Sequence, residues 1–211
     1  MTPRPVVVLL AGRSGAGKST FAPYLAHHLG AAVLDSDTLF AVPRRVVGDA
    51  NGLGMAVVSD PLWRESVHPR LLDLLLALAA CAATAERPAV AVSPWTAMLC
   101  SPARFAIATE GMEVDWRWVM LQAAPEICRA RIAARGWSMD HTKLADWDTY
   151  DRACRALRVP EGAYVADTSS VSSWPALGAE VARWVKGGTL GEDECTAHST
   201  RRSPIGEHHA R

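Results

Sequence analysis

The stretch VVVLLAGRSGAGKST, residues 6–20, constrains the fold of this chain more than any other segment. It places Gly12, Gly17, Lys18 and Ser19 in the pattern G-x-x-x-x-G-K-[S/T], after an apolar run typical of a buried strand and before an amphipathic segment. In that strand–loop–helix setting the pattern predicts a phosphate-binding loop. The glycines let successive backbone N–H groups turn toward phosphate oxygens, and the following helix adds the positive end of its dipole.

We expect this loop to hold the phosphates of ATP. In such loops the lysine, here Lys18, reaches the β- and γ-phosphates, and the hydroxyl of Ser19 ligates Mg²⁺. The alternative is a glycine-rich turn without a ligand, which the complete pattern disfavours. The predicted cofactor-binding residues of the loop are Gly12, Arg13, Ser14, Gly15, Ala16, Gly17, Lys18, Ser19 and Thr20.

Length and charge limit the classes of protein that fit. The chain has 211 residues, 49% of them hydrophobic, which is in the ordinary range for one domain. Lysine plus arginine equals aspartate plus glutamate at 22 each, so there is no broad basic surface for nucleic acid or an anionic membrane. The apolar start is too short for a signal or transmembrane segment. We therefore expect a cytoplasmic protein with no nucleic-acid or membrane partner, whose oligomeric state the sequence does not indicate.

Short apolar runs alternate with helical patterns along the chain, which is typical of a parallel sheet with helices on both faces. The predicted strands are residues 6–11, 32–34, 89–93, 116–122 and 163–166. The predicted fold class is therefore α/β, a P-loop NTPase fold with a five-stranded parallel sheet, in one kinase-like domain over residues 1–186. From 187 to 211 the sequence becomes polar, which predicts a disordered C-terminal tail.

Prolines and glycines mark the predicted helix boundaries. Asp60 precedes a proline and predicts a helix cap, but Pro69 should break or kink that segment, leaving 70–85 as the main second helix. The segments APEICRARIAARG and SSWPALGAEVARWVK carry an early proline, and the first ends in glycine. Both therefore predict helices, and the second closes the domain.

Two aspartates, Asp35 and Asp37, end the second predicted strand in AAVLDSDTLF. In a sheet of this kind ligands bind beyond the carboxyl ends of the strands. The alternation of a strand puts both carboxylates on one side if the extended geometry continues. A carboxylate beside Mg²⁺ can hold a metal-bound water, and a second can accept the proton of an attacking hydroxyl. The alternative is a helix cap at Ser36 or Asp37, and both roles can coexist.

These features together resemble the P-loop small-molecule kinases of the shikimate, gluconate and adenylylsulfate kinase type. The resemblance rests on the phosphate loop, D-S-D at the second strand, an arginine-bearing helix after the fourth strand, and VADTSS before the last helix. It covers roughly residues 5 to 186. Within that group, DPLWR before a long helix and AVAVSPWTAM at the third strand are closest to the tunicamycin-resistance ATP-binding proteins and antibiotic phosphotransferases.

The resemblance implies an ATP- and Mg²⁺-dependent phosphotransferase that acts on a hydroxyl-bearing small molecule, with antibiotics and secondary metabolites among the candidate acceptors. By position, Asp37 takes the role of the acceptor-binding carboxylate and base. Asp35 joins Ser19 as a metal partner, and Lys18 holds the transferring phosphate. Most of the rate would come from positioning and electrostatics.

The same resemblance assigns roles to two later segments. Arg131 and Arg135 lie four residues apart on one helix, and Arg131 or Arg135 would neutralise charge on the phosphoryl group during its transfer. The alternative for both is a solvated helix face. Asp167 and Thr168 match the loop that passes the adenine, although a plain turn with a helix cap has the same sequence pattern.

Departures from the family's pattern also carry information. The third predicted strand ends without an aspartate, which argues against a mechanical or switch NTPase and leaves the metal role to Asp35. The sequence Pro94-Trp95-Thr96 stands where shikimate kinases have glycines, so shikimate itself is disfavoured as the acceptor.

Aromatic and basic side chains are candidates for the acceptor pocket. The flat faces of Trp63, Trp95 and Trp137 would suit a ring or an apolar arm, with core packing as the alternative for each. Arg44 and Arg45 would clamp an anionic acceptor or lie in solvent. If they bind an acceptor phosphate, the protein is a nucleoside or nucleotide kinase. A further alternative is a protein that sequesters its ligand without transferring phosphate.

Overall fold

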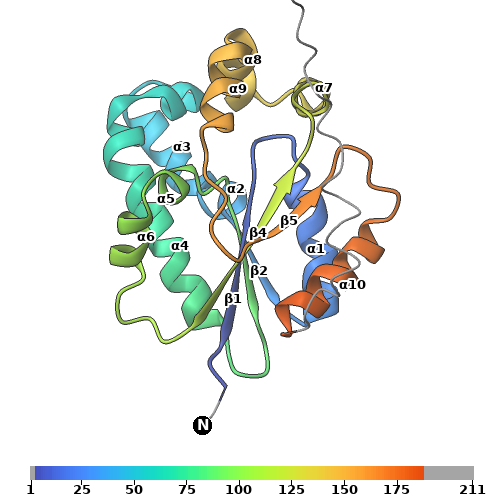
Figure 1. Ribbon diagram of the computed structural model, residues 1–211. Helices are drawn as coiled ribbons and strands as arrows, with labels where there is room; N and C mark the ends of the chain where they lie inside the picture. The colour runs from blue at the N-terminus through green and yellow to red at the C-terminus, as the bar shows by residue number, and fades with distance from the viewer. Residues whose placement is uncertain (1–2, 188–211) are drawn as a thin grey trace, which may run out of the picture.

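Five parallel strands form the centre of the fold in the order β2-β3-β1-β4-β5 (Figure 1). They are β1 (Val6–Ala11), β2 (Ala32–Asp35), β3 (Ala89–Val92), β4 (Asp115–Gln122) and β5 (Tyr164–Asp167). The predicted five-stranded parallel sheet is confirmed, and each predicted strand agrees with the observed one to within one residue at either end. The computed structural model describes residues 3–187, apart from the side chain of Met55; the tail predicted over 187–211 lies outside them except for Gly187.

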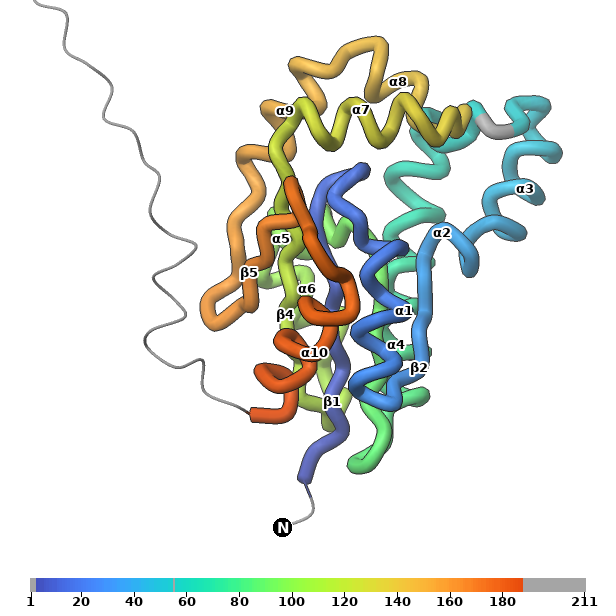
Figure 2. Tube along the Cα trace, turned by 90° about the vertical axis from the view of Figure 1, so that its right-hand side faces the viewer, coloured from blue at the N-terminus to red at the C-terminus, as the bar shows by residue number. Residues whose placement is uncertain are grey.

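Helices cover both faces of the sheet, which explains why the central strands β1 and β3 are apolar without alternation. On one face lie α1 (Lys18–Leu29) and α10 (Trp174–Val185), and on the other α4 (His68–Ala82), α5 (Thr96–Cys100) and α6 (Pro102–Ala108) (Figure 2). Phe21 and Leu25 of α1 and Leu75 and Leu76 of α4 are completely buried against the sheet. The core therefore has two layers, with β1 in the middle of the sheet between them.

Pro69 distorts the second long helix without breaking it. Asp60 caps the helical segment as predicted, because its Oδ1 accepts a hydrogen bond from the backbone N–H of Leu62 at 2.9 Å. A π turn over Trp63–Val67 then leads directly into α4. Since proline has no N–H to donate, the widened turn accommodates Pro69 near the start of α4. The predicted helix over 70–85 is therefore shifted: α4 begins two residues before the predicted start and ends three residues before the predicted end.

Two groups of helical segments extend beyond the carboxyl ends of the strands (Figure 1). The first group follows β2 and consists of α2 (Ser36–Leu39), α3 (Ala41–Ala50) and the short turn η1 (Gly54–Ser59). The second follows β4 and consists of α7 (Pro125–Arg135), the short turn η3 (Ser138–Asp140), α8 (His141–Ala145) and α9 (Trp147–Arg155). Gly136 ends α7 with a φ of 63°, as the sequence predicts. None of the helices in the described residues is both long and apolar enough to span a membrane.

Candidate active site

The loop between β1 and α1 has the backbone that its glycines predict. Gly12 and Gly15 have φ values of 138° and 82°, a region that other residues rarely adopt. A Cβ on Gly15 would also lie 2.5 Å from the carbonyl oxygen of Cys128 on α7, so the loop packs tightly against that helix. Lys18 Nζ donates hydrogen bonds to the carbonyl oxygens of Gly12 at 2.8 Å and Arg13 at 3.1 Å. The lysine therefore lies along the first half of the loop.

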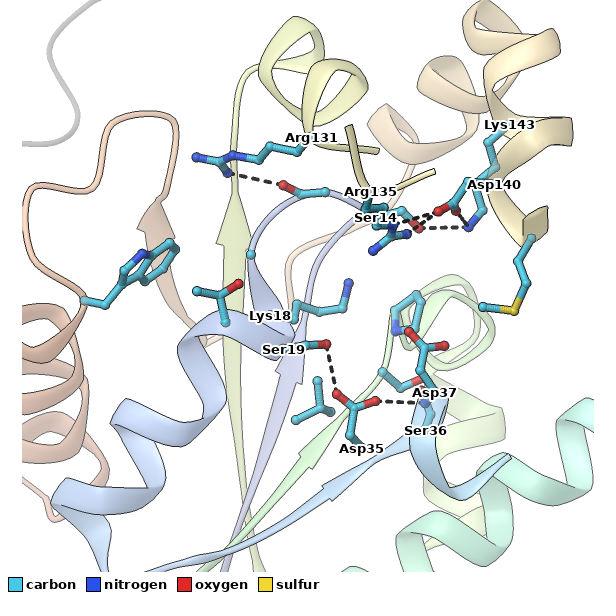
Figure 3. Close-up of a pocket in the computed structure, with 18 residues that line it drawn as sticks. Ser14, Lys18, Ser19, Asp35, Ser36, Asp37, Arg131, Arg135, Asp140 and Lys143 are labelled. Carbon is cyan, nitrogen blue, oxygen red and sulfur yellow. Dashed lines mark hydrogen bonds and ion pairs between the residues drawn. The ribbon is translucent and has the colours of Figure 1, made fainter. Parts of the chain in front are cut away.

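A cavity of about 490 Å³ opens at this loop (Figure 3). Its lining residues are Ser14, Gly15, Gly17, Lys18, Ser19, Thr20, Asp35, Ser36, Asp37, Val92, Ser93, Pro94, Arg131, Arg135, Met139, Asp140, Lys143 and Trp174. The structure thus brings both predicted aspartates, both predicted arginines and most of the predicted loop to one cavity. Gly12, Arg13, Ala16, Asp167 and Thr168 do not line it.

The two aspartates reach the cavity from different elements. Asp35 ends β2, and its Oδ2 accepts a hydrogen bond from Ser19 Oγ at 2.9 Å. Its Oδ1 accepts from the backbone N–H of Asp37 at 2.8 Å, so Asp35 is the N-cap of α2. The cap predicted at Ser36 or Asp37 lies one or two residues earlier, and the extended geometry ends before Asp37. Asp37 nevertheless faces the same space as Lys18 (Figure 3).

The Ser19 hydroxyl and the Asp35 carboxylate form an oxygen pair that suits Mg²⁺. This ion is commonly held by one or two protein oxygens together with waters and substrate phosphates. No cluster of three or more histidine, cysteine, aspartate or glutamate side chains that could hold a metal ion occurs in the described residues. The donor set therefore fits an ion that depends on a phosphate ligand and does not fit a cage made by the protein alone.

A buried carboxylate that sequence reasoning missed organises the opposite wall of the cavity. The side chain of Asp140 is 1% exposed and forms ion pairs with Arg135 at 2.6 Å and Lys143 at 2.7 Å. Lys143 Nζ also lies 3.0 Å from Ser14 Oγ in the loop. One carboxylate thus holds two cations over the loop, although no local pattern in the sequence pairs residue 143 with residue 14.

Helix α9 contacts the loop from its outer side, and this contact was also missed. Tyr150 Oη accepts a hydrogen bond from the backbone N–H of Ser14 at 2.9 Å. Arg13 forms an ion pair with Asp151, whose other oxygen binds Arg155 at 2.6 Å. Arg13 is therefore directed toward α9, away from the cavity, and contributes to the loop through its backbone.

Arg131 and Thr168 support the loop from the side of β5. The Thr168 side chain is completely buried, and its Oγ1 lies 2.7 Å from the carbonyl oxygen of Ala16. Arg131 donates to the carbonyl oxygens of Gly15 at 3.2 Å and Thr168 at 2.8 Å while also lining the cavity. Asp167 accepts a hydrogen bond from the N–H of Ser169 at 2.8 Å. This bond forms the plain turn that the sequence analysis gave as the alternative to a contact with adenine.

The electrostatic environment lowers the basicity of the loop lysine. Burial lowers the pKa of Lys18 to about 8, with the nearby charge of Asp37 acting in the opposite direction. The positive charges of Lys143 and Arg135 lower this pKa further. Binding of an anion beside Lys18 near pH 8 would therefore be accompanied by uptake of a proton by the lysine.

The three tryptophans singled out in the sequence occupy different environments. Trp63 and Trp95 are buried, at 3% and 0% exposure, so core packing applies to both. Trp137 is 43% exposed, and the guanidinium of Arg135 lies 4.4 Å from its ring centroid. A second cavity of about 500 Å³ borders it, lined by Asp37, Gly136, Trp137, Ser138 and Met139. An apolar space thus adjoins Asp37.

Solved structures with the same fold include several kinases. A putative kinase from Chloroflexus aurantiacus has a TM-score of 0.59 and 17% identity over 90% of this chain and 100% of its own. The APS kinase CysC of Mycobacterium tuberculosis, in complex with AMPPNP and APS, has a TM-score of 0.56 and 18% identity over 87% of this chain and 99% of its own. Shikimate kinase from Acinetobacter baumannii, in complex with shikimate, has a TM-score of 0.51 and 17% identity over 90% and 97%.

These likenesses confirm the predicted P-loop NTPase fold and the expected resemblance to P-loop kinases of small molecules at the level of fold. A search of curated proteins found no match. Residues 7–158 match the protein family described as an AAA domain (AAA_33). Because this match spans more than half of the chain, the protein belongs to the AAA domain family.

Proposed function

We propose that the protein is an ATP- and Mg²⁺-dependent phosphotransferase that phosphorylates a hydroxyl of a small molecule. The observation that carries this proposal is the presence of Lys18 and Asp37 in one cavity. A phosphate-binding lysine and a carboxylate that can accept a proton are the two groups that phosphoryl transfer to a hydroxyl requires. An antibiotic or secondary metabolite is the acceptor class that the sequence resemblance adds to this proposal.

The proposed nucleotide site uses the loop amides and Lys18 for the β- and γ-phosphates of ATP. Ser19 and Asp35 would hold Mg²⁺, which when bound neutralises charge on the β- and γ-phosphate oxygens. A structural neighbour supports this reading, since it is an APS kinase in complex with AMPPNP. Asp167 and Thr168, which the sequence placed beside the adenine, do not line this cavity.

Asp37 is the proposed general base. Its side chain borders both the cavity at the phosphate loop and the apolar cavity beside Trp137. A hydroxyl that donates a hydrogen bond to Asp37 would therefore lie between the terminal phosphate and an apolar compartment. A protein that only sequesters ATP and a ligand has no need of a carboxylate at that junction, which favours transfer over sequestration.

Lys143 is the proposed second lysine at the terminal phosphate. Lys18 Nζ lies at the carbonyl oxygens of Gly12 and Arg13, which directly precede Ser14 in the loop. Because the lysine of such loops reaches the γ-phosphate, that phosphate would lie near Ser14. Lys143 Nζ is 3.0 Å from Ser14 Oγ, and Asp140 fixes its direction. Lys143 would therefore add a positive charge at the phosphate that is transferred.

The substitution Asp37→Asn tests the proposed base. We expect turnover of ATP with the acceptor to fall by about 10²–10⁴-fold, the usual contribution of a positioned base. ATP affinity should stay within about two-fold, because the substitution keeps the size of the side chain. ADP release and calorimetric titration measure the two quantities, and Asp49→Asn, an exposed change on α3, is the matched control. Unchanged turnover in Asp37→Asn would remove this residue from the mechanism.

The lowered pKa of Lys18 predicts a pH-dependent affinity for ATP. The phosphates bind the charged amine, so binding raises the pKa of Lys18 above its free value of about 8. ATP affinity should therefore decrease as the pH rises through 8, and binding at pH 8 should take up protons. Calorimetry in two buffers with different ionisation enthalpies measures this uptake. Equal apparent enthalpies in both buffers, or the same uptake in Lys18→Met, would contradict the assignment.

The substitution Lys143→Met tests the second lysine. The substitution removes a contact that Lys143 would make only to the γ-phosphate. Its loss should weaken the binding of ATP by about ten-fold or more, since hydrogen bonds to charged groups contribute about 1.5–3 kcal/mol. ADP affinity should change less than two-fold. Titration calorimetry with both nucleotides gives the ratio, and Lys186→Met, an exposed change at the far end of α10, is the control. Equal losses for ATP and ADP would place Lys143 away from the terminal phosphate.

A further inference from the structure

Arg44, on α3, is a buried cation that has no close, hydrogen-bonded carboxylate partner among the described residues. The residue is 7% exposed, and in the described part of the chain its Nε has no hydrogen-bond partner. Its Nη1 donates only to the sulfur of Met139 at 2.8 Å, which is a weak acceptor. The nearest carboxylate oxygen, on Asp37, is 3.9 Å from Nη2. Buried charges are normally paired and hydrogen-bonded, so this guanidinium retains unused donors.

Two other arginines near the site, neither of them as buried as Arg44, each have a close carboxylate partner. Arg13 forms a close ion pair with Asp151, and Arg135 forms one with Asp140 at 2.6 Å. The remaining neighbours of Arg44 supply no negative charge. The ring of Trp63 lies 6.0 Å from the guanidinium carbon, and burial followed by the charges of Arg44 and Arg104 lowers the pKa of His68.

Met139 separates Arg44 from the cavities. Its side chain lines both the cavity at the phosphate loop and the apolar cavity beside Trp137, and Asp37 lines both as well. Methionine is flexible and is readily displaced by a bound group. A rotation of this one side chain would therefore expose the Nη donors of Arg44 to the space in which Asp37 faces the proposed acceptor.

We propose that Arg44 binds a carboxylate of the acceptor, so that the substrate is a hydroxy acid. This inference rests on the proposed function, because it places the acceptor beside Asp37. The planar guanidinium matches a carboxylate through two parallel hydrogen bonds. The separation of 3.9 Å between Arg44 Nη2 and Asp37 Oδ1 requires that the substrate's hydroxyl lie only a few bonds from its acidic group.

The charge balance favours a carboxylate over a phosphate. Arg44 contributes a single positive charge, and the carboxylate of Asp37 beside it would repel a dianion more strongly than a singly charged anion. A phosphate dianion would need a second cation here. The adjacent Arg45 is exposed and lines neither cavity bordering Asp37. The rival function of a nucleotide kinase, which required both arginines on one phosphate, loses support for the same reason.

Binding of small acids tests this proposal without any turnover. The protein is saturated with ADP and Mg²⁺ to fill the phosphate loop, and lactate, 3-hydroxybutyrate and mandelate are titrated at constant ionic strength, each against its own amide. Inorganic phosphate is titrated in the same way. Calorimetry on the wild type, Arg44→Met, Arg44→Lys and Arg45→Met compares the affinities, and ADP affinity within two-fold of the wild type shows that each variant is folded.

We expect at least one acid to bind about ten-fold or more tightly than its amide. This preference should disappear in Arg44→Met and persist in Arg45→Met. It should weaken in Arg44→Lys, because lysine lacks the planar pair of donors of the guanidinium. The proposal is overturned if no acid is preferred over its amide, if the preference survives in Arg44→Met, or if phosphate binds more tightly than every acid. If acids bind through Arg44 but no hydroxyl ever gains phosphate, the carboxylate site at Arg44 stands and the proposed function fails.

Discussion

Side chains from three distant segments hold the phosphate loop in its observed shape. The buried hydroxyl of Thr168 lies against one loop carbonyl, Arg131 donates to a second, and the hydroxyl of Tyr150 accepts from a loop amide. Each such hydrogen bond contributes only about 1 kcal/mol to stability. Their combined effect is geometric, because a loop that is already fixed needs no reorganisation when it meets the phosphates. The rest of the site is arranged around this fixed loop.

The charges around the loop divide into two groups. On the side of α7 and α8, Asp140 orients Arg135 and Lys143 toward the place where a terminal phosphate would lie. These cations are close enough to lower the pKa of Lys18, so positive charge predominates on this side of the loop. On the side of α2 and α3, Asp37 and Arg44 lie 3.9 Å apart without a direct hydrogen bond. The first group is suited to a nucleotide, and the second to an acceptor.

The fold could be predicted from the sequence because its signals are local. The buried strands β1 and β3 read as continuous apolar runs, and the phosphate loop carries its own pattern. Asp35 and Asp37 could be placed at the cavity because the end of a strand fixes their position. The role of Asp35 as the cap of α2 was missed, since the sequence does not show which residue leaves the extended conformation.

The missed part of the site depends on contacts between residues far apart in the chain. Lys143 and Tyr150 reach Ser14 across separations of 129 and 136 residues, and no periodicity or motif pairs them. The burial of Asp140 follows from the packing of η3 against η1 and α8, whereas the sequence around this residue shows only an ordinary charged turn. The different fates of Trp63 and Trp137, one in the core and one at the cavity, likewise depend on tertiary packing that tryptophan content does not reveal.

Transfer of the terminal phosphate of ATP is the most direct test of the proposed phosphotransferase function. ATP labelled with ¹⁸O in the γ-phosphate would be incubated with the wild-type protein, Mg²⁺ and a panel of hydroxy acids, sugars, nucleosides, amino alcohols and antibiotics, and products would be followed by mass spectrometry. If the protein is a phosphotransferase, we expect one class of acceptor to gain a single phosphate carrying the ¹⁸O label. Binding of ATP with no labelled acceptor anywhere in the panel would contradict it.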